Sequence, residues 1–135
     1  MRYLAIDHGQ KRTGLAVCDA SETIVTPHAV IETRSGSELS ERILSVIDAE
    51  NIEAVVIGLP VNMDGTEGPR ARQVRSFARR LSGKVSIPID FCDERLSTFE
   101  AERLAADLAL TRKKKKKRLD ALAAVEILKA FLSSK

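Results

Sequence analysis

The sequence predicts one α/β domain in which helices flank a five-stranded mixed β-sheet. Three short β-prone segments follow one another closely near the N-terminus, and two further apolar segments alternate with helical patterns. The chain has 135 residues, of which 44% are hydrophobic and 30% are charged, as in ordinary globular proteins. This length fits one domain and leaves little room for a second, so we expect residues 1–135 to form a single domain.

The first three strands are expected at residues 3–6, 13–18 and 24–31, where apolar and β-branched side chains gather. Only short turns separate these segments, and short turns join antiparallel neighbours. Pro27 lies inside the third segment and cannot donate a backbone hydrogen bond. We therefore expect an antiparallel meander whose third strand lies at a sheet edge or carries a bulge.

The middle of the chain alternates helical and strand patterns. Ser35 and Glu38 have the spacing of a capping box, and apolar residues at helical spacing follow, which predicts a helix over residues 37–50. Residues 54–59 are continuously apolar, as in a strand buried on both faces. Pro69 has the position of a first helical residue, so a second helix should begin there.

The C-terminal part continues the alternation. Residues 87–92 predict a fifth strand, and Ser97 with Glu100 forms a second capping-box pattern. The basic run 112–118 is expected to interrupt the helix that follows, and a last helix is expected at 119–132. Strands that alternate with helices form right-handed crossovers between parallel strands, so the complete sheet should be mixed.

Charge is unevenly distributed along the chain. Residues 112–118 carry seven positive charges, whereas the whole chain carries a formal net charge of +3, so the remainder is acidic. A basic segment on an acidic body indicates local contact with a polyanion. A solvated, low-complexity loop would have the same composition, and the run alone does not decide between the two.

The cysteine pattern and the N-terminus both favour the cytoplasm. Cys18 and Cys92 each end an apolar strand-like segment, and neither belongs to a CxxC pair, so we expect two buried, reduced thiols. The chain lacks a run of 18 apolar residues, and its N-terminus does not have the pattern of a signal peptide. We expect a cytoplasmic protein without membrane contact, either a monomer or a weak homodimer.

Three acidic residues are placed at the ends of predicted elements. Asp7 ends the first strand, Glu94 follows the fifth strand, and Asp120 begins the last helix. Ligands of parallel sheets bind beyond the carboxyl ends of the strands, which is where Asp7 and Glu94 belong. Carboxylates are hard oxygen ligands that suit Mg²⁺ or Mn²⁺, and such ions support phosphodiester hydrolysis. The three residues are therefore candidate catalytic and metal-binding residues.

Asp120 has two interpretations. It shares one helix face with Ala124, Ile127 and Phe131, and an acid on an apolar face is costly unless it is paired or bound to metal. An acid in a first helical turn is also favoured by the helix dipole without any ligand. Taken with Asp7 and Glu94, the metal-binding interpretation is the stronger one.

These residues lie in four sequence blocks. The blocks are AIDHGQKRTGLA at 5–16, IGLP with MDGTEGP at 57–60 and 63–69, DERLST with AE at 93–98 and 101–102, and DALAA with IL at 120–124 and 127–128. The blocks span nearly the whole chain, and four together are a far more specific signal than any one of them. With these blocks in this order, the sequence resembles the YqgF family, also called RuvX, whose members are described as Holliday-junction resolvases or pre-16S rRNA nucleases.

The resemblance implies an RNase H-like fold, hydrolysis of phosphodiester bonds, and a role in 5′-end maturation of ribosomal RNA. It also implies that Asp7, Glu94 and Asp120 are the acidic triad. Related resolvases carry a fourth acid shortly after the third, whereas residues 121–125 here are apolar and Glu126 is the nearest acid. The number of metal ions, one or two, therefore stays open.

Nucleic acid is the expected partner, either structured RNA or branched DNA. Aromatic residues are scarce, which disfavours stacking of single-stranded bases and favours recognition through phosphates and duplex shape. His8, next to Asp7, could assist proton transfer or could be an ordinary turn residue. The candidate nucleic-acid-binding residues are basic and lie near the predicted site; they are Lys11, Arg12, Arg70, Arg95, Lys113, Lys114, Lys115, Lys116 and Lys117.

The leading hypothesis is a metal-dependent nuclease that processes the 5′ end of pre-16S rRNA. A second hypothesis within the same class is resolution of branched DNA. A nucleic-acid-binding assembly factor with a vestigial site belongs to a different class. A nucleotide-binding phosphotransferase is a further alternative, because Gly9 and Gly14 have a weak similarity to the phosphate loop of actin-like ATPases.

Overall fold

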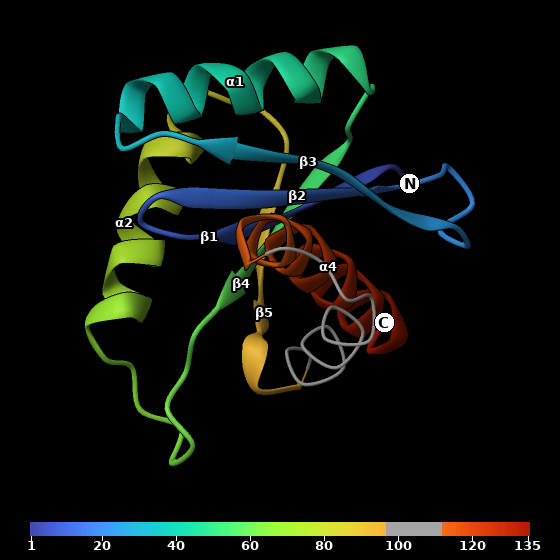
Figure 1. The fold of residues 1–135 in the computed structure, drawn as a ribbon. Helices are drawn as coiled ribbons and strands as arrows, with labels where there is room; N and C mark the ends of the chain where they lie inside the picture. Colours follow the sequence, from blue (N-terminus) through green and yellow to red (C-terminus); the bar gives the residue numbers. More distant parts are fainter. Residues whose placement is uncertain (97–111) are drawn as a thin grey trace.

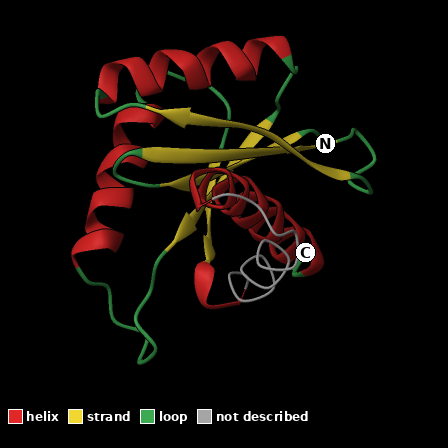
Figure 2. Cartoon of the chain, in the orientation of Figure 1, coloured by secondary structure: helices red, strands yellow, loops and turns green. Residues whose placement is uncertain are grey.

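The computed structural model describes residues 1–96 and 112–135, with the backbone alone for Leu96 and for residues 112–120. The capping box expected at Ser97 and Glu100 lies outside the described residues. Figures 1 and 2 show a twisted sheet with helices on both faces.

The sheet has five strands in the order β3-β2-β1-β4-β5. The pairs β1–β2 and β2–β3 are antiparallel, whereas β1–β4 and β4–β5 are parallel, which confirms the predicted mixed sheet. Strand β4 is buried along its whole length, as its continuous apolar sequence indicates. The strands are β1 (Tyr3–His8), β2 (Arg12–Cys18), β3 (Val25–Glu32), β4 (Ala54–Leu59) and β5 (Ile89–Asp93).

Strand β3 lies at the sheet edge and is irregular, as Pro27 predicts. Leu15 of β2 pairs with Ala29, but the next residue, Ala16, pairs with Pro27. The register therefore shifts by one residue at His28, and this bulge accommodates a proline that cannot donate to the ladder.

Two helices cover one face of the sheet and one helix covers the other (Figure 1). Helices α1 (Gly36–Ala49) and α2 (Pro69–Ser82) pack on the first face. The long helix α4 (Arg112–Ser133) crosses the second face over β1, β2 and β3. A short 3-10 helix, η1 (Glu94–Leu96), follows β5 directly.

Strand alternation distributes the residues of β1 between two cores. Leu4 and Ile6 belong to the core under α1 and α2, whereas Tyr3 and Ala5 belong to the core under α4. By the same alternation, Asp7 belongs to the α4 face and His8 to the opposite face. The imidazole of His8 accordingly stacks on Phe77 of α2, with ring centroids 4.4 Å apart.

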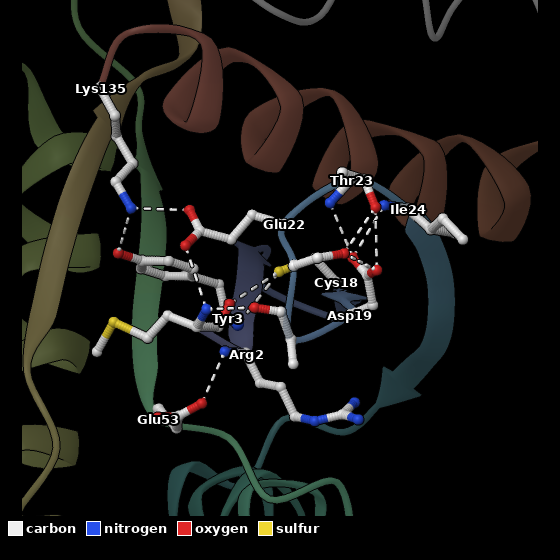
Figure 3. Close-up of polar contacts among 12 residues, drawn as sticks. Arg2, Tyr3, Cys18, Asp19, Glu22, Thr23, Ile24, Glu53 and Lys135 are labelled. Atoms are coloured by element: carbon white, nitrogen blue, oxygen red, sulfur yellow. Dashed lines mark hydrogen bonds and ion pairs between the residues drawn. The ribbon is translucent and has the colours of Figure 1, made fainter.

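The far end of the domain is held by a polar network at the two chain termini (Figure 3). The Nζ atom of Lys135 donates to Glu22 Oε1 at 2.8 Å and to the Tyr3 hydroxyl at 3.1 Å. The amino group of Met1 donates to the other carboxylate oxygen of Glu22 at 3.1 Å. These contacts attach the end of α4 to the beginning of β1, and so contribute to holding α4 across the sheet.

Three details differ from the sequence-based expectation. Helix α4 begins at Arg112, not near residue 119, because lysine and arginine have good intrinsic helix propensity and the basic run extends the helix. Strand β5 begins at Ile89, two residues later than expected. Ser35 caps α1 by accepting from the backbone N–H of Glu38 at 3.2 Å, but the Glu38 carboxylate accepts from Thr33 Oγ1 and does not complete a capping box.

Both cysteines are free thiols that are buried, as expected. Within the described part of the chain, no helix is long and apolar enough to cross a membrane.

Candidate functional site

Two carboxyl groups meet at the carboxyl ends of the parallel strands. Asp7 is contributed by β1, and Glu94 is the first residue after β5. Their side chains are hydrogen-bonded to each other. Burial, and then the hydrogen bond and negative charge of Glu94, raise the pKa of Asp7 to about 8, while the charge of Arg70 acts in the opposite direction. Asp7 is therefore mostly protonated at neutral pH, and one proton holds the two groups together.

Gly58 of β4 makes room for this pair. A Cβ atom at this position would lie 2.6 Å from Glu94 Oε1 and 2.5 Å from Cδ1 of Ile127 on α4. Both distances are shorter than real Cβ contacts, so any larger residue at this position would force the side chains of Glu94 and Ile127 to shift. Sequence reasoning did not single out Gly58, although a glycine inside a continuous apolar strand can indicate a close approach.

Asp120 lies in the second to third turn of α4. It precedes Ala124 and Ile127 by four and seven residues, and both of these are fully buried against the sheet. The backbone position thus agrees with the predicted stripe, but the Asp120 side chain is outside the described residues. Among the side chains that are described, no group of three or more His, Cys, Asp or Glu residues gathers. The third ligand therefore stays a prediction.

The paired carboxyl groups fit a divalent cation. Two hard oxygen donors are held in direct contact, and each would be ionised when bound to Mg²⁺ or Mn²⁺. Burial, and then the neighbouring Glu94, raise the pKa of Asp7, and a bound cation would offset both effects by stabilising the ionised carboxylates. Glu126, the nearest acid after Asp120, is 15% exposed and lies 3.9 Å from Lys129 in an ion pair on its own helix.

His8 does not take part in this carboxyl cluster. Its side chain lies on the opposite face of the sheet, against Phe77. Burial, together with the charges of Arg70 and Arg80, lowers the pKa of His8 to about 4. His8 is consequently neutral at pH 7 and has the position of a packed structural residue.

Arg70 and Arg95 brace the loops around the pair. Arg70, in the first turn of α2, donates to the backbone oxygen of His8 at 2.6 Å. Arg95 forms an ion pair with Asp93 at 2.6 Å and donates to the backbone oxygen of Met63 at 3.2 Å. Both arginines therefore fix backbone at the strand ends.

The other basic candidates lie at two separate places. Lys11 and Arg12 lie at the turn between β1 and β2, where Lys11 is exposed and Arg12 is 3.4 Å from Glu32. The five lysines of the basic run are in the first turns of α4, with side chains outside the described set. Their contact with nucleic acid stays a prediction.

The glycines of the first turn have a structural explanation. A Cβ atom at Gly9 would collide with the backbone oxygen of Arg12, so glycine is required for this tight turn. Gly14 pairs with Asp7 inside the antiparallel ladder. Both glycines thus have a role in a β-hairpin, which weakens the phosphate-loop interpretation.

The strand order and the flanking helices define an RNase H-like fold of the kind found in RuvC-type resolvases. Thermus thermophilus RuvC, solved in complex with a Holliday junction substrate, superimposes with a TM-score of 0.62 at 16% identity, covering 99% of this chain and 95% of that one. The fowlpox virus Holliday junction resolvase gives a TM-score of 0.61 at 11% identity, covering 100% of both chains. At these identities the likeness establishes the fold alone.

The sequence comparison identifies the family. Residues 1–134 match the RuvX family, described as Holliday junction resolvase. A relative from Syntrophomonas wolfei subsp. wolfei, named "Putative pre-16S rRNA nuclease", is 38% identical over 132 residues, which are 98% of this chain and 94% of the relative. A relative of the same name from Rhizobium meliloti is 42% identical over 127 residues, covering 94% and 77%. The chain belongs to the RuvX family.

Proposed function

We propose that this protein is a metal-dependent nuclease that hydrolyses phosphodiester bonds during maturation of the 5′ end of pre-16S rRNA in the cytoplasm. The observation that carries the proposal is the hydrogen-bonded pair Asp7–Glu94 at the carboxyl ends of parallel strands. The names of the relatives support the choice of ribosomal RNA as substrate. We further propose that residues 1–135 act as one domain, as a monomer or a weak homodimer.

The residues of the proposed site have separate tasks. Asp7 and Glu94 would hold Mg²⁺ or Mn²⁺, and Asp120 would complete the ligand set from α4. Such a cation, when bound, activates a water molecule and stabilises the leaving oxygen. Gly58 leaves room for the Glu94 side chain next to Asp7, and Arg70 fixes the end of β1 near the two carboxyl groups.

Basic residues near the site would supply affinity through phosphates. The lysine run ends three positions before Asp120 in the sequence, and Lys11 is exposed on the turn that follows Asp7 and His8. Neutralising a phosphate releases counterions, so affinity should decrease as salt increases.

A Holliday-junction resolvase is the second candidate, because the family description and the fold relatives both name that substrate. A direct comparison separates the two. A precursor rRNA fragment and a four-way DNA junction, each end-labelled, would be incubated with the purified protein and Mg²⁺ at equal concentration. We expect the RNA to be cut at a defined position and the junction to be cut at least about tenfold more slowly, a difference of about 1.4 kcal/mol in barrier.

Preferential cutting of the junction would replace the rRNA proposal with the resolvase. Binding of RNA without any cutting, at every metal concentration, would instead favour an assembly factor with a vestigial site. Tight ATP binding by calorimetry would favour the phosphotransferase.

A further inference from the structure

A cavity lies near the same end of the sheet as the carboxyl pair, on the face that carries His8 and not Asp7. It has a volume of about 320 Å³ and lies between the β1–β2 turn, the beginning of α1 and one side of α2. Its charged side chains are Arg34, Arg70 and Arg80, and the hydroxyl groups of Ser35 and Ser76 also line it. None of the described residues that line this cavity is acidic.

Two of the three arginines of this arginine pocket, Arg34 and Arg80, lack an acidic partner among the described residues. Both residues are exposed. The nearest acid on α1 in the sequence, Glu38, accepts a hydrogen bond from Thr33 at 2.9 Å and does not line the cavity. Three guanidinium groups around one cavity repel one another unless an anion lies between them.

The beginning of α1 adds to the positive potential. The Arg80 guanidinium reaches Gly36, where an added Cβ atom would lie 3.2 Å from Nη1. Gly36 is the first residue of α1, so the guanidinium lies next to the positive end of a 14-residue helix. The Arg80 guanidinium is unfavourable next to the N-terminal end of α1 because both are positive, whereas an anion between them would be stabilised by both.

We propose that the arginine pocket binds a phosphate group. Guanidinium groups match phosphate with paired, charge-assisted hydrogen bonds, and serine hydroxyls add neutral donors. The phosphate belongs either to a nucleic-acid strand or to a free phosphate compound. If the phosphate belongs to a nucleic-acid strand, this inference rests on the proposed nuclease function, and the pocket is a second place on the protein, away from the acidic pair, where the strand is contacted.

Arg70 connects the two places. Its guanidinium donates to the backbone oxygen of His8, lines the cavity, and lowers the pKa of Asp7 through its charge. The pocket and the carboxyl pair therefore lie on either side of the end of β1. A strand that passes over this end would place one phosphate at Asp7 and Glu94 and another in the pocket.

The test compares two double variants that remove the same charge. The pocket variant is Arg34→Gln with Arg80→Gln, and the control is Arg42→Gln with Arg79→Gln. The control arginines are also exposed and do not line the cavity; Arg42 lies on α1, which begins two residues after Arg34, and Arg79 is next to Arg80 on α2. A labelled single-stranded RNA and a duplex RNA would be titrated by fluorescence anisotropy in EDTA, so that nothing is cut. Inorganic phosphate would be titrated in parallel by following backbone amide signals in NMR spectra.

We expect the pocket variant to bind RNA at least about tenfold more weakly than the control variant, because it loses charge-assisted hydrogen bonds to a phosphate. Its salt slope should be less steep by about 0.7–0.9 for each lost phosphate contact. The amide shifts of Ser35 and Gly36 caused by phosphate should disappear in the pocket variant only. Thermal unfolding of both variants would establish that each is folded.

The two sources of phosphate give different results. Weaker RNA binding together with lost phosphate shifts assigns the pocket to a nucleic-acid strand, whereas lost phosphate shifts with unchanged RNA binding assign it to a free phosphate compound. Equal behaviour of the pocket and control variants towards both probes would overturn the proposal. Because these titrations need no cleavage, the pocket can be established even if the nuclease proposal fails.

Discussion

Asp7→Asn should abolish cleavage, with a loss of at least about a hundredfold, while the protein remains folded. Removing groups that merely orient metal ligands costs about 10–100-fold, and Asp7 is proposed as a ligand itself. An amide has one weak oxygen donor in place of a charged carboxylate. The measurement is the cleavage rate of the labelled precursor RNA at saturating Mg²⁺, with both proteins purified in parallel from a host that lacks contaminating nucleases.

The same variant should be more stable than the wild type without metal, and increasingly so as the pH rises. The folded-state pKa of Asp7 is raised from 3.8 to about 8, so the folded protein holds a proton that the unfolded chain releases. Wild-type stability therefore decreases as the pH rises from about 4 to 8. Asparagine carries no ionisable group and avoids this loss. Near pH 8 the unfolding free energy of the variant should exceed that of the wild type by at least about 1 kcal/mol, which corresponds to about one unit of pKa shift.

Asp90→Asn is the matched control, because Asp90 is an exposed acid on β5 that is not part of the pair. Denaturant unfolding of the three proteins at pH 5 and pH 8 gives the comparison. If Asp7→Asn cut RNA at the wild-type rate, Asp7 would have no place in the chemistry. If its stability relative to the wild type were the same at both pH values, the claim that Asp7 has a raised pKa in a buried carboxyl pair would be contradicted.

Gly58→Ala should lower both activity and stability through a single added methyl group. The new Cβ atom would meet Glu94 Oε1 at 2.6 Å and Ile127 Cδ1 at 2.5 Å, so both side chains must move. Overpacking of this kind typically costs about 1–3 kcal/mol of unfolding free energy. A displacement of Glu94 by about 1 Å should reduce the cleavage rate on the order of a hundredfold.

Gly68→Ala provides the control for this substitution. A Cβ atom at Gly68 would come no closer than 3.6 Å to the side chain of Asn62, which is an ordinary contact. We expect this variant to keep wild-type cleavage and to change the unfolding free energy by less than about 1 kcal/mol. Wild-type cleavage by folded Gly58→Ala would show that the position of Glu94 does not matter for the reaction.

The sequence was sufficient to predict the sheet and to place two of the three candidate acids at one end of it. Continuous apolar residues in β4 and the closely spaced strands before it predict a mixed sheet, because burial on both faces and short turns each restrict strand pairing. Asp7 and Glu94 follow from the rule that parallel strands gather their carboxyl ends. Their direct contact confirms that they lie at one end of the sheet.

Other features depend on distances that no local pattern contains. The composition of the basic run predicts a break between two helices, yet the run forms the beginning of α4. Helix propensity and the packed turns that follow outweigh the repulsion between its charges. The role of Gly58 arises from contacts with Glu94 and with Ile127 of α4, and the arginine pocket arises where α1, α2 and the β1–β2 turn meet. Arg34 and Arg80 are 46 positions apart in numbering, so their proximity appears only in the fold.

The most direct test of the proposed metal centre is a titration with Mn²⁺, followed by the loss of the free-ion signal in electron paramagnetic resonance. Wild type, Asp7→Asn and Asp120→Asn would be compared at pH 7.5, with Asp90→Asn as control. We predict that the wild type and the control bind Mn²⁺ with equal affinity, and that each of the other two variants binds at least about tenfold more weakly. Equal Mn²⁺ affinity in all four proteins would contradict a metal centre built from these acids.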